Sequence, residues 1–209
     1  MVELGSNENV IDLRSYVDPT RVPTLVFVDL QEEYIAAPRR LAVPGAAQAL
    51  DKCRVALAHA RAIGLPIAFT RWMGRAPFFN RATRFSSWIK GFEPFGTEMV
   101  FERDRPSCYA SVRFAEMMDM TGGGNIVLTG FAGETACLAT VIDAYHRGQQ
   151  TTFLSDASAS HSIDDISSSD LHRIVSKLMR MYGTVITTED WVRATEVNES
   201  MGGERRWVR

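Results

Sequence analysis

The sequence predicts a three-layer α/β/α domain, Rossmann-like, with a mostly parallel six-stranded sheet. Short apolar runs rich in β-branched residues alternate with segments that carry apolar residues at helical spacing. Several of these helical segments are ten or more residues long, which is enough for the crossover between two parallel strands. A chain of 209 residues, 45% of them hydrophobic, fits one domain with a sizeable core.

The expected strands are short apolar runs bounded by polar residues, proline or glycine. The first, TLVFVDL (24–30), lies between Pro23 and the polar residues QEE, which is typical of a buried strand. The others follow in order: LPIAFTR (65–71), MVFER (99–103), NIVLTG (125–130), TTFLSD (151–156) and TVITT (184–188). Residues 72–98, between the second and third strands, are aromatic and irregular.

The expected helices lie between these strands. Residues 46–63 have apolar side chains at helical spacing and end at Gly64, a good C-cap. The next helices are 111–120, followed by three glycines, then 134–147, which carries Cys137, and 164–182, which begins with serines. Strands separated by helices in this way are expected to pair in parallel.

One domain is expected to span residues 1–209, with its core at about 20–192. No repeat, linker or low-complexity segment interrupts it. The tail, 193–209, is expected to be loosely held or donated to a partner subunit.

Composition excludes several classes of protein. A net charge of −2 with mixed signs gives no basic footprint for nucleic acid. No apolar run approaches the roughly 20 residues of a membrane span. The polar N-terminus lacks the layout of a signal peptide, and three cysteines form neither a disulfide framework nor a zinc set. We therefore expect a cytoplasmic protein with a small-molecule substrate.

Three polar residues come at or just after the ends of expected strands, the edge where such sheets bind ligands. Asp29 closes the first strand, Arg103 closes the third, and Cys137 follows the fourth at the start of a helix. A helix N-terminus and a nearby cation would hold the pKa of Cys137 below the roughly 8.5 of a free thiol. Other interpretations remain open: a buried apolar role for Cys137, a turn cap for Asp29, and a solvated charge for Arg103.

Three segments around these residues resemble the motifs of the isochorismatase-like cysteine hydrolases. They are VFVDLQEEY, FERDRPSCYASVRF and TGFAGETACLATVIDAYHRG, and the resemblance extends over about residues 20–192. It implies hydrolysis of an amide or carbamoyl group or, in the namesake branch, of a vinyl ether. It implies a catalytic aspartate at Asp29, a catalytic cysteine at Cys137, and no cofactor.

The resemblance also implies a non-proline cis peptide bond before the cysteine helix, at Phe131–Ala132 or Ala132–Gly133. The backbone N–H groups of Gly133 (or Ala132) and Cys137 would then form the oxyanion hole. Where the family usually has a lysine, this chain has Arg103, with Arg105 as a second candidate. Residues 65–100 contain no histidine, so no metal site of the nicotinamidase branch is expected.

The segment after the second strand should cover the pocket with aromatic side chains. Trp72, Phe78 and Trp88 are candidate substrate-binding residues, together with Cys108 and Tyr109 from the loop after Arg103. The aromatics of 72–98 and the tail sequence RRWVR also favour a homo-oligomer.

Three functions remain open. The first is a cysteine-dependent hydrolase of a small amide, carbamoyl or related C–N substrate, acting through a thioester. The second is an isochorismatase-type vinyl ether hydrolase that uses the aspartate alone. The third is a catalytically silent ligand-binding relative, because arginine replaces the usual lysine.

Overall fold

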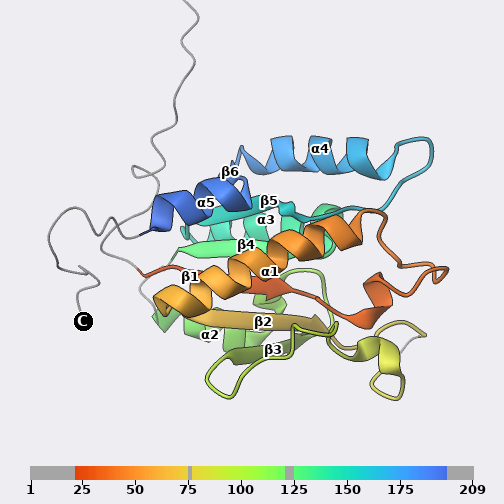
Figure 1. The fold of residues 1–209 in the computed structure, drawn as a ribbon, viewed down its shortest axis with the longest axis horizontal. Coiled ribbons are helices and arrows are strands. Elements are labelled where there is room, and N and C mark those ends of the chain that lie inside the picture. Colours follow the sequence, from red (N-terminus) through yellow and green to blue (C-terminus); the bar gives the residue numbers. More distant parts are fainter. Residues whose placement is uncertain (1–21, 75–76, 121–124, 197–209) are drawn as a thin grey trace, which may run out of the picture.

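The computed structural model describes residues 22–74, 77–120 and 125–196. Its six strands form one sheet in the order β3-β2-β1-β4-β5-β6, and every pairing is parallel (Figure 1). The strands are β1 (Thr24–Val28), β2 (Ile67–Trp72), β3 (Met99–Arg103), β4 (Ile126–Gly130), β5 (Thr151–Ser158) and β6 (Thr184–Ile186). The predicted α/β fold is confirmed, and the sheet is wholly rather than mostly parallel.

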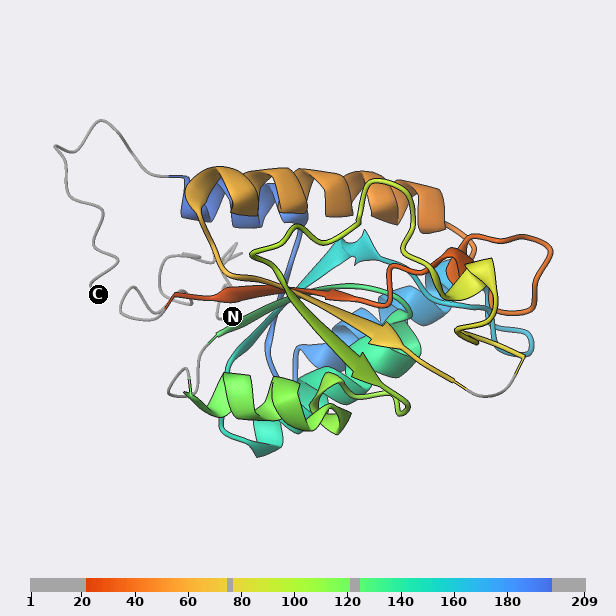
Figure 2. The same ribbon diagram turned by 90° about the horizontal axis from the view of Figure 1, so that it is seen from below.

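The sheet lies between two layers of helices (Figure 2). On one face are α1 (Ala46–Ile63) and α5 (Thr188–Thr195); on the other are α2 (Val112–Met120), α3 (Leu138–His146) and α4 (Ser168–Met179). Each face buries its own apolar cluster, one containing Phe27 and Phe69 and the other containing Phe114 and Phe153. The cores therefore lie directly above and below the central strands.

The direction of the chain reverses beside β1. The chain runs outward from β1 through β2 to β3, then returns to form β4 on the other side of β1. The carboxyl ends of β1 and β4 are thus adjacent at the switch point, where open α/β sheets bind their ligands.

The helices near the C-terminal end of the domain differ from the sequence prediction, and α4 is shorter at both ends than the expected 164–182. α4 begins at Ser168 rather than 164, because the side chain of Ser167 accepts a hydrogen bond from the Asp170 N–H and caps the helix there. Helix α5 was not among the expected helices, although the side chain of Thr187 caps it in the same way by accepting a hydrogen bond from the Asp190 N–H. Trp191 of α5 is 2% exposed and packs against α1 through His59, so residues 193–195, expected in the tail, belong to the folded domain.

Candidate active site

Asp29 follows β1 with a left-handed backbone, at φ 49°. This conformation is uncommon for a residue with a side chain, and such exceptions cluster at functional sites. The Asp29 side chain is fully buried, and its Oδ2 accepts a hydrogen bond of 2.6 Å from Nη2 of Arg103. Its other oxygen, Oδ1, has no hydrogen-bond partner among the described residues. Asp29 therefore caps no turn with its side chain and has one carboxylate oxygen free.

Arg103, the last residue of β3, is also fully buried in its side chain. Besides Asp29, it donates through Nη1 to the carbonyl oxygen of Arg105 at 2.6 Å. Its guanidinium carbon lies 5.2 Å from the centre of the Trp72 ring. Arg103 is thus not a solvated charge, and the exposed Arg105 contributes a carbonyl to it.

The Asp29 carboxyl has a raised pKa, at about 6 instead of 3.8. Burial is the largest cause, and the charge and hydrogen bond of Arg103 partly oppose it. The Asp29 carboxyl is therefore ionised at neutral pH, and its pKa is close enough to neutral pH for it to accept a proton during a reaction.

Cys137 lies at the end of a π-helix, Gly133–Cys137, which leads directly into α3. An α-helix was expected from residue 134, whereas α3 begins at Leu138. Such π-turns are rare and frequent at functional sites. The Cys137 Sγ atom is 3.6 Å from the carbonyl oxygen of Gly130 and 4.0 Å from Oγ of Ser158.

Gly130 at the end of β4 makes this approach possible. Its φ is 107°, and a Cβ there would lie 2.1 Å from the carbonyl oxygen of Val28. Only glycine fits this position. It brings the end of β4, and with it Cys137, against the end of β1 that carries Asp29.

The pKa of Cys137 is raised well above 9, opposite to the direction expected from sequence. Burial is the main cause, followed by the neighbouring Cys108, while the hydrogen bond with Ser158 acts in the other direction. The charge of Asp29 also raises this pKa, so Asp29 and Cys137 lie within electrostatic range without a direct hydrogen bond. At neutral pH Cys137 is a thiol beside a carboxylate.

The expected cis peptide bond is present at Phe131–Ala132. The two backbone donors expected to bind the oxyanion are occupied, however. The N–H of Gly133 donates to the carbonyl of Ala159 at 2.9 Å, and that of Cys137 donates to the carbonyl of Ala132 at 3.2 Å. The N–H of Ala132 has no hydrogen-bond partner among the described residues.

A cavity of about 390 Å³ opens beside these residues. Its lining is mostly apolar and consists of Tyr34, Leu41, Trp72, Gly74, Phe78, Phe79, Pro106, Thr135 and His161. Tyr34 lies in this lining, and burial, followed by the nearby charge of Asp29, raises its pKa. Asp29, Arg103 and Cys137 themselves do not line this cavity and are buried behind its wall.

Two of the five expected substrate-binding residues, Trp72 and Phe78, line this cavity. The other three do not line it. Trp88 packs on Phe69, with ring centres 5.6 Å apart. Cys108 and Tyr109 are buried in the core under α2, because the fold uses this loop for packing.

The isochorismatase domain model matches residues 23–190 of the chain. The chain belongs to the isochorismatase family. The match includes every strand and the three polar residues of the site.

Relatives within and around the isochorismatase family differ in their named activities. The secreted isochorismatase effector Isc1 of Verticillium dahliae is 22% identical over 174 residues, 82% of this chain and 90% of that protein. Streptothricin hydrolase of Streptomyces noursei is 28% identical over 144 residues, 68% of this chain. That match covers only 51% of the hydrolase, so the chain spans about half of its length.

Solved structures have the same fold. An isochorismatase from Pseudomonas putida KT2440 is 25% identical with a TM-score of 0.76, covering 81% of this chain and 89% of that one. N-carbamoylsarcosine amidase from Thermoplasma acidophilum is 22% identical with a TM-score of 0.63, covering 80% and 96%.

Sequence reasoning missed an ion pair at the cavity of this isochorismatase-family chain. His161 bonds to Oε1 of Glu134 through Nδ1 at 2.6 Å and to the carbonyl of Leu41 through Nε2 at 3.1 Å. Both partners accept hydrogen bonds, an arrangement that favours a proton on each ring nitrogen. The hydrogen bond with Glu134 is the main reason for the raised pKa of His161. The pair joins the turn before Cys137 to the loop at Leu41, a contact between residues 120 positions apart that no local pattern reveals.

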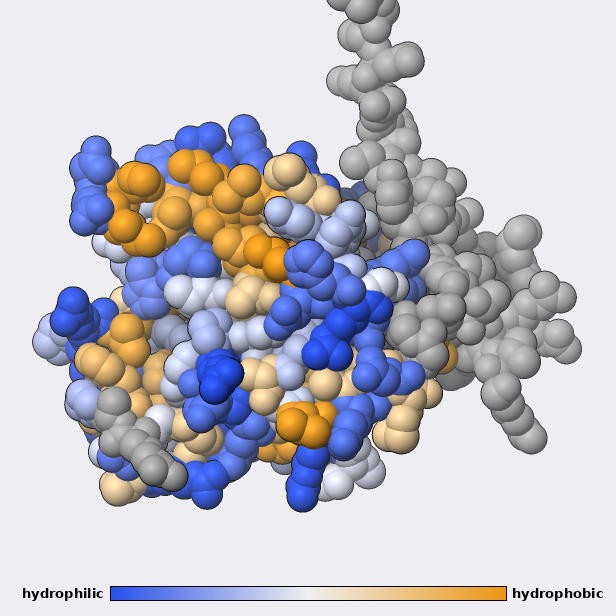
Figure 3. All heavy atoms as spheres, turned by 180° about the vertical axis from the view of Figure 1, so that it is seen from behind, coloured by the Kyte–Doolittle hydropathy of each residue, from blue (hydrophilic) through white to orange (hydrophobic). Residues whose placement is uncertain are grey.

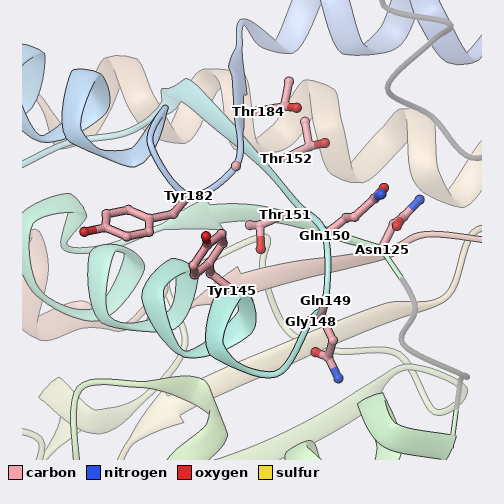
Figure 4. Close-up of a pocket in the computed structure, with 10 residues that line it drawn as sticks. Asn125, Tyr145, Gly148, Gln149, Gln150, Thr151, Thr152, Tyr182 and Thr184 are labelled. Carbon is pink, nitrogen blue, oxygen red and sulfur yellow. The ribbon is translucent and has the colours of Figure 1, made fainter.

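A second cavity, of about 460 Å³, lies at the opposite edge of the sheet, near the amino ends of β4, β5 and β6 (Figure 4). Its lining includes Tyr145, Thr151 and Tyr182 but no Asp, Glu, His, Cys, Lys or Arg side chain. A third cavity, of about 560 Å³, lies beside β3 and is lined by Arg103 together with Arg81 and Glu102. We assign the chemistry to the first cavity because its lining residues Trp72 and Thr135 come close in space or sequence to Arg103 and Cys137, respectively.

None of the described helices is long and apolar enough to cross a membrane. The cytoplasmic location stays a prediction, and one of the relatives is named a secreted protein.

Proposed function

We propose that the chain is a cysteine-dependent hydrolase of a small amide or carbamoyl compound that acts through a thioester. The buried ion pair of Asp29 and Arg103 at the carboxyl edge of the sheet, with Cys137 following the adjacent strand β4, carries this proposal. The family supports hydrolysis, and relatives named as a hydrolase of streptothricin and an amidase support a C–N bond as the target.

The first step forms a bond between Sγ of Cys137 and the substrate carbonyl carbon. Because Cys137 is a thiol at rest, Asp29 takes its proton as the bond forms, and Oδ1 is the oxygen free to do so. The free N–H of Ala132 is the candidate donor to the developing oxyanion. Arg103 keeps Asp29 ionised and oriented.

The second half of the reaction returns the proton. Asp29 protonates the departing nitrogen as the C–N bond breaks, which leaves an acyl group on Cys137. Asp29 then accepts a proton from the water that attacks the thioester, and returns it to Sγ of Cys137 as the C–S bond breaks, which releases the acid and restores the free thiol. Atoms and charges balance without a cofactor.

The second candidate is a vinyl ether hydrolase of the isochorismatase type. The buried, high-pKa thiol of Cys137 favours it, because such a reaction needs only the acid function of Asp29. Ammonia release across a panel of small amides, ureas and carbamoyl compounds tests the first candidate. Ammonia release supports it; turnover of a vinyl ether alone, or binding of small acids without turnover, contradicts it.

We expect kcat/KM to fall about tenfold for each pH unit below about 6, because Asp29 must be ionised to accept the thiol proton and its pKa is about 6. If the base were an aspartate with an ordinary pKa, the enzyme would keep its activity to a pH about two units lower. A pH–rate profile with one neutral substrate measures this. Constant activity between pH 7 and pH 5 would show that Asp29 is not the base.

A further inference from the structure

The cavity at the amino ends of β4, β5 and β6 has a lining without charged side chains (Figure 4). It measures about 460 Å³, which is within the range of small-molecule sites. Two tyrosines, three threonines, three residues with carboxamide side chains and two glycines form it. It shares no residue with the aromatic cavity beside Asp29, Arg103 and Cys137, so a ligand here would not occupy the place of the substrate of the proposed hydrolysis.

Thr151, the first residue of β5, is the most buried residue of this lining, at 3% exposed. Its Oγ1 atom is buried and has no hydrogen-bond partner among the described residues. Figure 4 shows its side chain pointing toward Tyr145, whereas those of Thr152 and Thr184 point the other way. A buried hydroxyl without a hydrogen bond is unfavourable, so a ligand group that bonds to this Oγ1 would be favoured.

Further polar groups of the lining are free to bind a ligand. The hydroxyls of Tyr145 and Tyr182 and the amide of Gln150 form no hydrogen bond within the described part of the chain. The amide of Gln149 is already bonded at both ends, to the hydroxyl of Tyr109 and to a carboxylate of α2. The free groups are therefore hydroxyls and a carboxamide, which both donate and accept hydrogen bonds.

The two tyrosine rings add an apolar surface to these groups. They pack edge-on with ring centres 5.5 Å apart, and Tyr145 is 54% exposed. A tyrosine side chain combines an apolar ring with a polar tip. A sugar-like molecule has the matching surface, because its C–H groups can cover the rings while its hydroxyls both donate and accept hydrogen bonds. We propose that this cavity binds a neutral polyhydroxy compound of about the size of a monosaccharide.

The site differs chemically from the exposed apolar surface of α4. Figure 3 shows hydrophobic residues gathered along the top of the molecule, where α4 runs. Ile174 and Leu178, which are exposed on that helix, do not line the cavity. Tyr182, which does line it, comes three residues after the end of α4. The cavity therefore begins past the end of the helix, where the lining is polar or aromatic.

An NMR titration of the full-length, ¹⁵N-labelled chain with D-glucose, D-galactose and myo-inositol tests the proposal. We expect amide peaks of residues 148–152 and 182–184 to shift and to saturate with at least one of these compounds, with a Kd of about 1 mM. D-glucuronate should bind no more tightly than D-glucose, because the lining offers no cation.

Thr151→Val should weaken this binding roughly tenfold, because valine has nearly the same shape but lacks the hydroxyl. Its melting temperature should be unchanged or higher, since Oγ1 has no hydrogen bond to lose in the free protein. Tyr145→Ala should also weaken binding, through loss of the ring. Phe95→Ala removes another exposed ring, 61% exposed and outside the cavity, and is the matched control that should bind like the wild type.

Three results would overturn the site. They are the absence of saturable shifts at these peaks with all three neutral compounds, tighter binding of D-glucuronate than of D-glucose, and wild-type affinity in both Thr151→Val and Tyr145→Ala.

Discussion

Cys137→Ala is expected to lower kcat for amide hydrolysis by about 10⁴-fold or more, since loss of a nucleophile removes the covalent route altogether. Within 4.0 Å of Sγ the only hydroxyl partner is Ser158, which has no base of its own among the described residues. Steady-state ammonia release measures the loss.

Cys53→Ala is the matched control for this substitution. Cys53 of α1 is another fully buried cysteine, which contacts the hydroxyl of Thr129 and donates to the carbonyl of Ala157, and it does not line the cavity. The Cys53→Ala variant should keep the wild-type activity, although it loses a buried side-chain volume similar to that lost in Cys137→Ala. Near-full activity of Cys137→Ala would exclude the thioester and favour the vinyl ether reaction.

Arg103→Leu should have the second-largest effect, on both stability and activity. It leaves Asp29 buried without its cation, which costs about 3–5 kcal/mol of unfolding free energy at neutral pH. The pKa of Asp29 should rise further above 6, so the folded state binds a proton that the unfolded state releases. Stability therefore falls as pH rises between the unfolded and folded pKa values, and the loss should be larger at pH 7.5 than at pH 5.

Urea unfolding at the two pH values measures this difference, and the acid limb of the pH–rate profile should move to higher pH. Arg103→Lys, which restores the residue usual in the family, should recover most of both properties because it keeps the cation beside Asp29. An Arg103→Leu variant with equal losses at both pH values would show that Arg103 acts through packing and not through charge.

The succession of strands along the chain could be predicted from the sequence because it depends on local patterns. Apolar runs end at Asp29 and Arg103, and parallel strands bring their carboxyl ends to one edge. The environment of Cys137 was not predictable in this way. Its pKa depends on complete burial, and the engaged N–H of Gly133 depends on Ala159, which is 26 positions later.

Long-range packing also explains why three of the expected substrate-binding residues do not line the cavity. Tyrosine is a residue type that often contacts ligands, but the hydroxyl of Tyr109 bonds to Gln149 and its ring packs on Phe114. The ion pair of Glu134 and His161 joins two segments whose proximity depends on β5 returning beside β4.

Rapid-quench mass spectrometry during turnover of an amide substrate tests the covalent mechanism most directly. The account predicts that the chain gains the mass of the acyl group, that this mass maps to the peptide with Cys137, and that Asp29→Asn prevents its formation. Ammonia release in the first turnover with no acyl group on Cys137 would contradict it.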